Sequence, residues 1–183
     1  MKLKNDSFKI LGRKTVYKSV KLQIDRAKIQ LPNGNIDKWD VNVLPSFYFG
    51  VPTVDGKVIM TREWRLGPNK VLTQFTGTRC VSDNENKNLG ELKRELKEEL
   101  GLEGGKYISQ ITFAWGFRTT GNVTYYTVEG FKIGKTSRDE NEIQEIIKLP
   151  IKGLFDELLK NHVITSDTLL VAKLLEERYK KHS

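Results

Sequence analysis

The chain has 183 residues, of which 38% are hydrophobic and 30% charged, and its formal net charge is +8. This length and composition suit one globular domain with its own core, and they exclude a disordered chain or one with a bilayer-spanning apolar run. The single cysteine, Cys80, excludes an intrachain disulfide and a multi-cysteine zinc site. The N-terminal residues lack the apolar stretch of a signal peptide, so we expect a cytoplasmic protein.

Alternating apolar residues predict strands in the first half of the chain. Val20, Leu22 and Ile24 recur at every second position, which predicts one strand over residues 16–29. Residues 31–35 follow as a turn, because Asn-Gly is a strong hairpin signal. Further strands are expected over residues 39–43, 47–51, 58–65 and 71–75, with tight turns at 55–56 and 67–70.

The pattern changes after residue 80. Asn88 precedes Leu89 and stands three residues before Glu91, which predicts a helix N-cap with a capping-box carboxylate. Gly101 is the expected end of this helix. Strands over 108–113, 123–128 and 143–149 and helices over 151–159 and 167–179 complete the prediction. Mostly antiparallel strands around one central helix predict an α/β sandwich rather than a doubly wound parallel sheet.

The central helix carries the sharpest chemical signal. Its leucines form one apolar stripe, made of Leu89, Leu92, Leu96 and Leu100. Glu95 and Glu99 are four residues apart and therefore neighbours at one edge of that stripe. Their repulsion would be cancelled by Mg²⁺ or Mn²⁺, which prefer carboxylate oxygens. A solvated helix face with ordinary surface pairs is the alternative interpretation.

A family resemblance favours the metal site. Residues 94–102 read Arg-Glu-Leu-Lys-Glu-Glu-Leu-Gly-Leu, which resembles the second half of the Nudix box, R-E-U-x-E-E-x-G-U with U apolar. Phe75-Thr76-Gly77 resembles the Pro-Ala-Gly that opens the box in ADP-ribose pyrophosphatases. The first half departs from the family, because the gap from Gly77 to Arg94 is three residues longer. Asn86 and Thr73 also stand where the family has acidic residues.

Weaker matches follow in the same order along the chain. They are an N-terminal hairpin at 25–34, Arg62-Glu63-Trp64-Arg65 in place of a Gln-Tyr-Arg segment, the acidic late loop 139–143, and the start of the last helix at 164–169. The resemblance implies a Nudix-type α/β/α sandwich with a mixed sheet over residues 46–183. It also implies an N-terminal antiparallel β-strand subdomain over residues 1–45, which would join two copies in a homodimer.

The same resemblance implies a chemistry. Members of this branch split the pyrophosphate of a nucleoside diphosphate linked to another group, so ADP-ribose or a nucleotide sugar is the expected substrate and Mg²⁺ or Mn²⁺ the expected cofactor. Metal ligation falls to Glu95, Glu99 and the main-chain carbonyl of Thr76. Glu98 would pair with Arg94 and hold the helix, with a possible contact to the metal. The late loop would supply the general base, with Glu140 as first choice and Glu142 as second; without the family, this loop reads as acidic surface.

Substrate contacts are predicted from residue chemistry. Arg65 is the candidate for binding a phosphate, since a planar guanidinium can do so bidentately, and Arg62 is a weaker candidate. Trp39 or Trp64 could stack on a base, although packing is the commoner role of an aromatic in a strand. Cys80 and His162 are interpreted as incidental.

Two other functions stay open. A catalytically weak or inactive Nudix-fold nucleotide-binding module is favoured by the altered segment 77–88 and opposed by the intact run 94–102. RNA binding or decapping is suggested by the +8 charge. That hypothesis ranks last, because the basic residues are scattered along the sequence and no RNA-binding motif appears. We expect no membrane partner.

Overall fold

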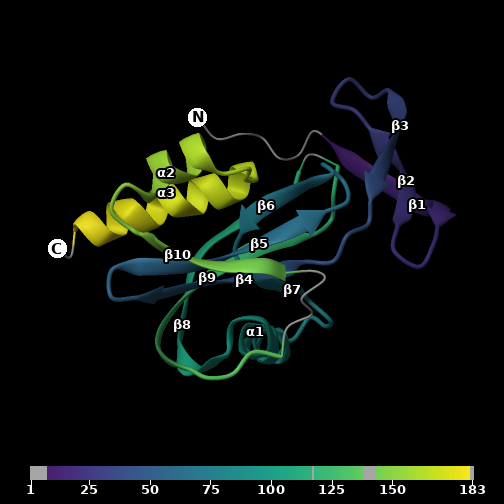
Figure 1. Cartoon of the computed structure of the whole chain (residues 1–183). Helices are drawn as coiled ribbons and strands as arrows, with labels where there is room; N and C mark the ends of the chain where they lie inside the picture. Colours follow the sequence, from purple (N-terminus) through teal and green to yellow (C-terminus); the bar gives the residue numbers. More distant parts are fainter. Residues whose placement is uncertain (1–7, 117, 138–142, 182–183) are drawn as a thin grey trace. The chain divides into compact units, whose positions relative to one another are not determined.

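The computed structural model describes residues 8–116, 118–137 and 143–181. The chain forms two compact units (Figure 1). Unit 1 comprises Met1–Ser46 and Phe113–Asn122, and unit 2 comprises Phe47–Thr112 and Val123–Ser183. None of the helices in the described part of the chain has the length and apolarity that a bilayer crossing requires.

Unit 1 is built on an antiparallel sheet of three strands. Their order is β1 (Lys9–Lys18), β2 (Gln23–Gln30) and β3 (Ile36–Asn42). The prediction of one strand over residues 16–29 is therefore wrong, because a tight turn separates β1 from β2. In that turn the Ser19 N–H donates to the Leu22 carbonyl at 2.8 Å, and the Leu22 N–H donates to Ser19 Oγ at 3.1 Å. Val20 sits at the tip and is 96% exposed, so its place in the apolar alternation was misleading.

The second turn of unit 1 is the predicted Asn-Gly hairpin. The Leu31 N–H donates to the Asn35 carbonyl at 2.8 Å, and Gly34 adopts a φ of +86°, which glycine tolerates without strain. This turn sets a regular register in which Ala27 lies opposite Trp39. The turn prediction is confirmed.

Unit 2 contains a mixed sheet. Its strands are β4 (Phe47–Val54), β5 (Lys57–Arg65), β6 (Lys70–Gln74), β7 (Gly77–Arg79), β8 (Leu102–Ala114), β9 (Asn122–Ile133) and β10 (Ile143–Pro150). The order is β10-β5-β4-β9-β8, with β6 added to β5 and β7 to β4. β4 and β9 run parallel, whereas β5 is antiparallel to β10, β4 and β6. The predicted turn at Asp55 and Gly56 is confirmed, and both residues have positive φ.

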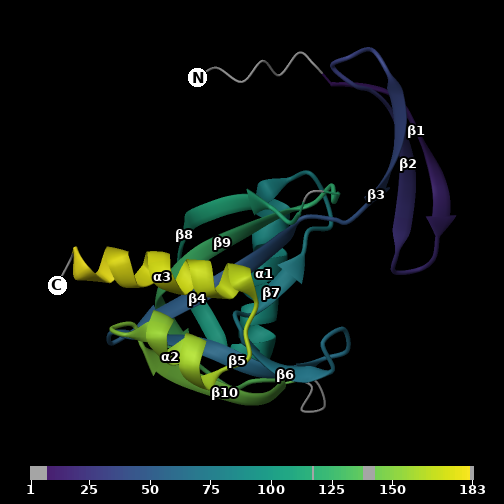
Figure 2. The same cartoon turned by 90° about the horizontal axis from the view of Figure 1, so that it is seen from above.

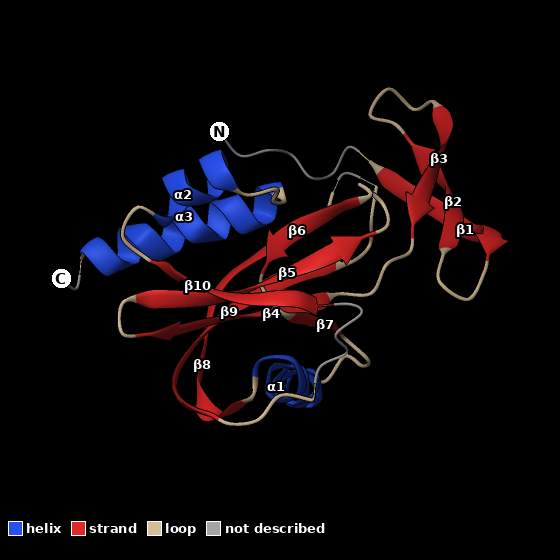
Figure 3. Ribbon diagram, in the orientation of Figure 1, coloured by secondary structure: helices blue, strands red, loops and turns tan. Residues whose placement is uncertain are grey.

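Helices cover both faces of this sheet. α1 (Glu85–Leu100) lies on one face, and α2 (Leu154–Asn161) and α3 (Ser166–Lys180) lie on the other (Figure 3). Seen from above, α2 and α3 both lie over the same side of the strands (Figure 2). The predicted α/β/α sandwich with a mixed sheet is therefore confirmed.

The leucine stripe anchors α1 to the sheet. Leu92, Leu96 and Leu100 are buried in one cluster with residues of β5 and β9, and Leu89 packs at its margin. β4 contributes Gly50, where a Cβ atom would lie only 2.6 Å from Leu96 Cδ1. The helix can therefore approach β4 closely, which fixes the position of its carboxylate edge.

The ends of the helices differ partly from the prediction. α1 begins at Glu85 with Asn84 as its N-cap, and Asn84 accepts a hydrogen bond from the Lys87 N–H at 3.1 Å. The prediction that Asn88 caps the helix is wrong, since Asn88 lies one turn inside it. Gly101 ends α1 in the left-handed conformation, as predicted. α2 begins three residues later than predicted, because its N-cap Gly153 has a φ of +79°.

Candidate active site

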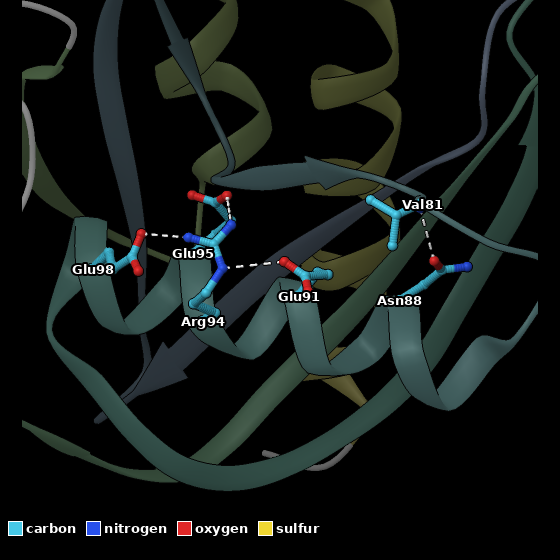
Figure 4. Close-up of polar contacts among 6 residues, drawn as sticks. All are labelled: Val81, Asn88, Glu91, Arg94, Glu95 and Glu98. Atoms are coloured by element: carbon cyan, nitrogen blue, oxygen red, sulfur yellow. Dashed lines mark hydrogen bonds and ion pairs between the residues drawn. The ribbon is translucent and has the colours of Figure 1, made fainter.

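Asn88 joins the long segment before α1 to the helix itself. Its amide oxygen accepts a hydrogen bond from the Val81 N–H at 3.0 Å (Figure 4). The same oxygen accepts from the Ser82 N–H at 3.2 Å, and the amide nitrogen donates to the Ser82 carbonyl at 2.8 Å. The side chain is almost fully buried. Asn88 stands seven residues before Glu95 and eleven before Glu99, which is about two and three helical turns. It therefore lies on the same edge of the helix as these two glutamates. It therefore ties the segment that follows β7 to the edge that carries the carboxylates.

Arg94 binds three carboxylates of α1 at once. Its Nη1 and Nη2 lie 2.6 Å from oxygens of Glu98 and Glu95, and its Nε lies 3.1 Å from Glu91 (Figure 4). The predicted Arg94–Glu98 pair is present. The hydrogen bonds that Arg94 donates to Glu98 and Glu91 raise its pKa above the ordinary value. One guanidinium thus compensates three negative charges only in part, and this edge of α1 stays anionic.

Glu99 lies at the same edge without such compensation. It is partly buried, and among the described residues no lysine, arginine or histidine nitrogen lies within ion-pair distance of it. Its carboxyl has a pKa raised to about 7; burial is the main cause, and repulsion from Glu95 and Glu63 acts in the same direction. The Thr76 hydroxyl and Arg65 act in the opposite direction. A positive charge bound beside Glu99 would remove this electrostatic cost.

Thr76 faces the site between β6 and β7. Its carbonyl accepts a hydrogen bond from the Gly50 N–H at 2.9 Å, which leaves one lone pair for another partner. Its hydroxyl is buried and makes no hydrogen bond of ordinary geometry within the described part of the chain, although it lies close enough to lower the pKa of Glu99. Buried polar atoms without partners are rare in native proteins. This hydroxyl therefore marks a place where a further polar group fits.

The oxygen donors at this edge suit a hard cation. Carboxylates, a carbonyl and a hydroxyl are the ligands that Mg²⁺ and Mn²⁺ prefer. Within residues 8–116, 118–137 and 143–181, however, no three acidic, histidine or cysteine side chains are grouped closely enough to hold an ion by themselves. The donors present fit an ion that keeps several waters or substrate oxygens, as Mg²⁺ commonly does.

Glu63 and Gln74 join the site, and the sequence did not indicate them. Glu63 binds the Arg65 guanidinium through both carboxylate oxygens, at 2.9 and 3.0 Å. Gln74 donates to Glu63 at 2.6 Å and accepts from Arg65 Nε at 3.2 Å. Three of the five N–H groups of Arg65 are thereby held in place, and its side chain remains 46% exposed. The one available signal was the i, i+2 spacing of Glu63 and Arg65, which places both on one face of β5.

Of the other predicted residues, Arg62 is not brought to this edge. Arg62 alternates to the opposite face of β5 and pairs with Glu145 at 3.0 Å. Trp39 belongs to unit 1, where its Nε1–H donates to Asp37 at 2.8 Å and the Arg118 guanidinium lies 5.8 Å from its ring centre. Glu140 and Glu142 lie outside the described residues.

Thr73 explains one departure from the family pattern. Its hydroxyl lies 2.9 Å from His162 Nδ1, and its N–H donates to the Val163 carbonyl at 2.8 Å. The position where the family carries a glutamate is thus used to attach the segment between α2 and α3. Burial raises the pKa of the Cys80 thiol, which agrees with an incidental cysteine rather than a nucleophile.

Comparison with known proteins extends the fold assignment. No family model matches the chain, and no curated protein matches its sequence. A solved structure described as "Crystal structure of ADP compounds hydrolase" is similar to this one, with a TM-score of 0.80 over 97% of this chain and 96% of that chain. The two sequences are 17% identical. The two proteins share a fold. The likeness extends through almost the whole chain, both units included.

Proposed function

We propose that the chain is a metal-dependent Nudix hydrolase that cleaves the pyrophosphate bond of a nucleoside diphosphate linked to another group, such as ADP-ribose or a nucleotide sugar. The observation that carries the proposal is the placement of Glu99 beside the buried hydroxyl of Thr76, with Glu95 one turn away at the same edge of α1. The Arg94–Leu102 run supplies this edge. The name of the structurally similar ADP compounds hydrolase supports the same class of substrate.

Glu95, Glu99 and the Thr76 carbonyl are the proposed metal ligands. When bound there, a divalent cation would neutralise the diphosphate and lower the pKa of a water molecule. Arg94 holds Glu95 through one oxygen only, so the other carboxylate oxygen is available. Glu98, which is bound by Arg94 Nη1, has the proposed task of orienting that guanidinium and with it Glu95.

Arg65 is the proposed phosphate-binding residue. Two of its N–H groups are not used by Glu63 or Gln74. Its partly exposed guanidinium lies close enough to Glu99 for its charge to lower the pKa of that carboxyl. A guanidinium held from one side can bind an anion with its other side at a small cost in conformational entropy. Glu63 and Gln74 therefore orient Arg65 for its substrate.

Three further assignments stay predictions from the sequence. The general base is Glu140, or Glu142 in second place. Trp39 would stack on the nucleobase of the substrate. It lines a cavity of about 480 Å³ in unit 1 together with Phe8, Arg13 and Arg118. A homodimer is the expected assembly, and light scattering would measure it.

Turnover tests the proposal directly. Phosphate release would be measured with Mg²⁺ or Mn²⁺ on ADP-ribose, GDP-mannose, UDP-glucose, NADH and a capped RNA, with a phosphatase added to convert the primary products. We expect one preferred substrate class and loss of turnover in Glu99→Gln. Glu177→Gln, an exposed helix glutamate of α3, is the matched control and keeps full activity.

Metal binding gives a second readout. Titration with Mn²⁺, followed by its paramagnetic resonance signal, should show binding that Glu99→Gln weakens and Glu177→Gln does not. Absence of turnover with nucleotide binding retained would instead favour the non-catalytic binding module. Turnover that persists in Glu99→Gln would contradict the assignment of the site.

A further inference from the structure

Unit 1 holds most of the excess positive charge of the chain. Its described residues include nine lysines and arginines but only three aspartates and no glutamate. The excess of six compares with a formal net charge of +8 for all 183 residues. Basic residues that are scattered along the sequence are therefore concentrated by the fold.

The register of the three strands places these charges on one face. Residues directly opposite each other in an antiparallel pair share a face of the sheet. Lys14 lies opposite Arg26, which lies opposite Asp40, and Lys28 lies opposite Lys38. With Lys9, opposite Gln30, they form what we call the basic face: Lys9, Lys14, Arg26, Lys28 and Lys38. All five side chains belong to exposed residues.

The basic face is electrostatically unfavourable in isolation. Among the described residues of the three strands, Asp40 is the one carboxylate on the same side of the sheet, and it is bound to Arg26 at 2.7 Å. Within the described residues, the four lysines make no ion pair. Like charges directly opposite each other destabilise a sheet, and this one contains two such pairs, Lys14–Arg26 and Lys28–Lys38. An arrangement that costs stability is expected where a ligand of opposite charge compensates it.

Exposed apolar groups accompany the cations. Tyr17 lies opposite Ile24 on the same face and is 51% exposed, and Ile36 lies opposite Gln30 and is 55% exposed. Along β2, Arg26 and Lys28 are two residues apart, so their charges are about 7 Å from each other. This distance is comparable with the spacing of successive phosphates in an extended polynucleotide. Cations that follow a backbone, with an aromatic ring on which a base can stack, are the features that bind single strands. We propose that the basic face of unit 1 binds a single-stranded polynucleotide.

Fluorescence anisotropy of a labelled 15-nucleotide single-stranded RNA of mixed sequence tests the proposal, with the full chain titrated from 0.05 to 0.3 M salt. Four lysine–phosphate contacts predict a slope of log K against log salt of about −3. Lys14→Glu combined with Lys38→Glu should weaken binding at least tenfold. The same two changes convert the like-charge pairs into opposite-charge pairs, so Tm should stay the same or rise by about 1–3 °C. If the double variant binds RNA more weakly while its Tm is unchanged or higher, the loss comes from missing contacts and not from a damaged sheet.

Matched variants complete the experiment. Lys132→Glu combined with Lys152→Glu makes the same change of net charge on exposed residues of unit 2 and should leave the affinity within twofold. Tyr17→Leu, which keeps apolar surface but removes the ring, should weaken binding about fivefold. Equal loss in the unit 2 control would overturn the proposal in favour of a net-charge effect.

Three other results would overturn it. One is no binding of the RNA at 0.1 M salt. Another is binding to vesicles of phosphatidylserine and phosphatidylcholine without binding to RNA, which would assign the face to a membrane surface. The third is that the unchanged chain does not bind RNA but forms a dimer, which Lys14→Glu combined with Lys38→Glu converts to a monomer. That result would assign the basic face to a contact between two copies of the chain. None of these readouts depends on hydrolysis.

Discussion

The amide oxygen of Asn88 lies 3.0 Å from the backbone nitrogen of Val81, inside the fold rather than at the start of α1 (Figure 4). The stretch from Gly77 to Arg94 is three residues longer than the family resemblance implies, and the Asn88 side chain binds the part of it that precedes α1. Asn88 binds the preceding loop and does not cap the helix, because the N-cap of α1 is Asn84. The segment that precedes α1 is thus attached to the helix by this side chain.

Asn88→Ala should lower the free energy of unfolding by about 1–3 kcal/mol. The change leaves two N–H groups and one carbonyl of residues 81–82 without their protein partner. Asn88→Asp keeps the acceptor but loses the donor to Ser82, so its loss should be smaller. Urea denaturation measures both, with Asn84→Ala, the loss of an N-cap worth about 1 kcal/mol, as the comparison. A loss in Asn84→Ala alone would show that Asn88 contributes nothing to the loop.

Glu99 should make the metal-free protein less stable as pH rises. Its pKa is raised from 4.5 to about 7 in the folded chain, so the folded state holds this proton more tightly than the unfolded state. The stabilisation is therefore fully present below pH 4.5 and is lost as pH rises through about 7. Thermal unfolding from pH 4.5 to 8 should show this fall, and Glu99→Gln should flatten it. Saturating Mn²⁺ should restore stability most strongly above pH 7, because the ion competes with the proton.

A fall in stability that is the same in Glu99→Gln would assign the titration to another group. Glu177→Gln is again the suitable control, because Lys173 and Lys180 lower the pKa of that exposed glutamate. Its small contribution to pH dependence has the opposite sign, since it is lost as pH falls.

Gly50 of β4 and Gly90 of α1 should respond oppositely to substitution by alanine. Gly50→Ala would place a methyl group 2.6 Å from Leu96 Cδ1, in a buried cluster that cannot yield freely, and should destabilise the fold by about 1–3 kcal/mol. Gly90→Ala, where a Cβ would meet nothing within 4 Å, should stabilise the helix by up to about 1 kcal/mol. Chemical denaturation of both variants checks the pair. Equal effects would mean that α1 does not pack on β4 as closely as the structure shows.

Local signals in the sequence predicted the parts of the fold that local chemistry decides. Asn-Gly and Asp-Gly turns, the Gly101 helix end and the leucine stripe each depend on residues close together in the chain. The turn between β1 and β2 was missed because it contains neither glycine nor proline. A serine hydroxyl supports it instead, and Val20 continued the apolar alternation through it.

The rest of the site depends on contacts between distant segments. The edge of Glu95 and Glu99 was predictable from helical spacing. The Glu63–Gln74–Arg65 cluster was not, because it requires β5 and β6 to pair in one register and to lie beside α1. The basic face of unit 1 likewise depends on which residue of β1 lies opposite which residue of β2. Two register shifts within that pair decide this, and the sequence pattern does not show them.

Arg65→Lys and Arg62→Lys should separate the two arginines that the sequence proposed together for substrate binding. Arg65 is held by Glu63 and Gln74 with part of its guanidinium free, so a lysine there loses both the bidentate geometry and the support. We expect KM to rise about tenfold in Arg65→Lys, corresponding to about 1.4 kcal/mol of binding, with kcat affected less.

Arg62 lies on the other face of β5 in an exposed pair with Glu145, and an exposed pair contributes little. Arg62→Lys should therefore leave KM within twofold. Steady-state kinetics on the preferred substrate gives both values, and a larger rise in KM for Arg62→Lys would reverse the assignment.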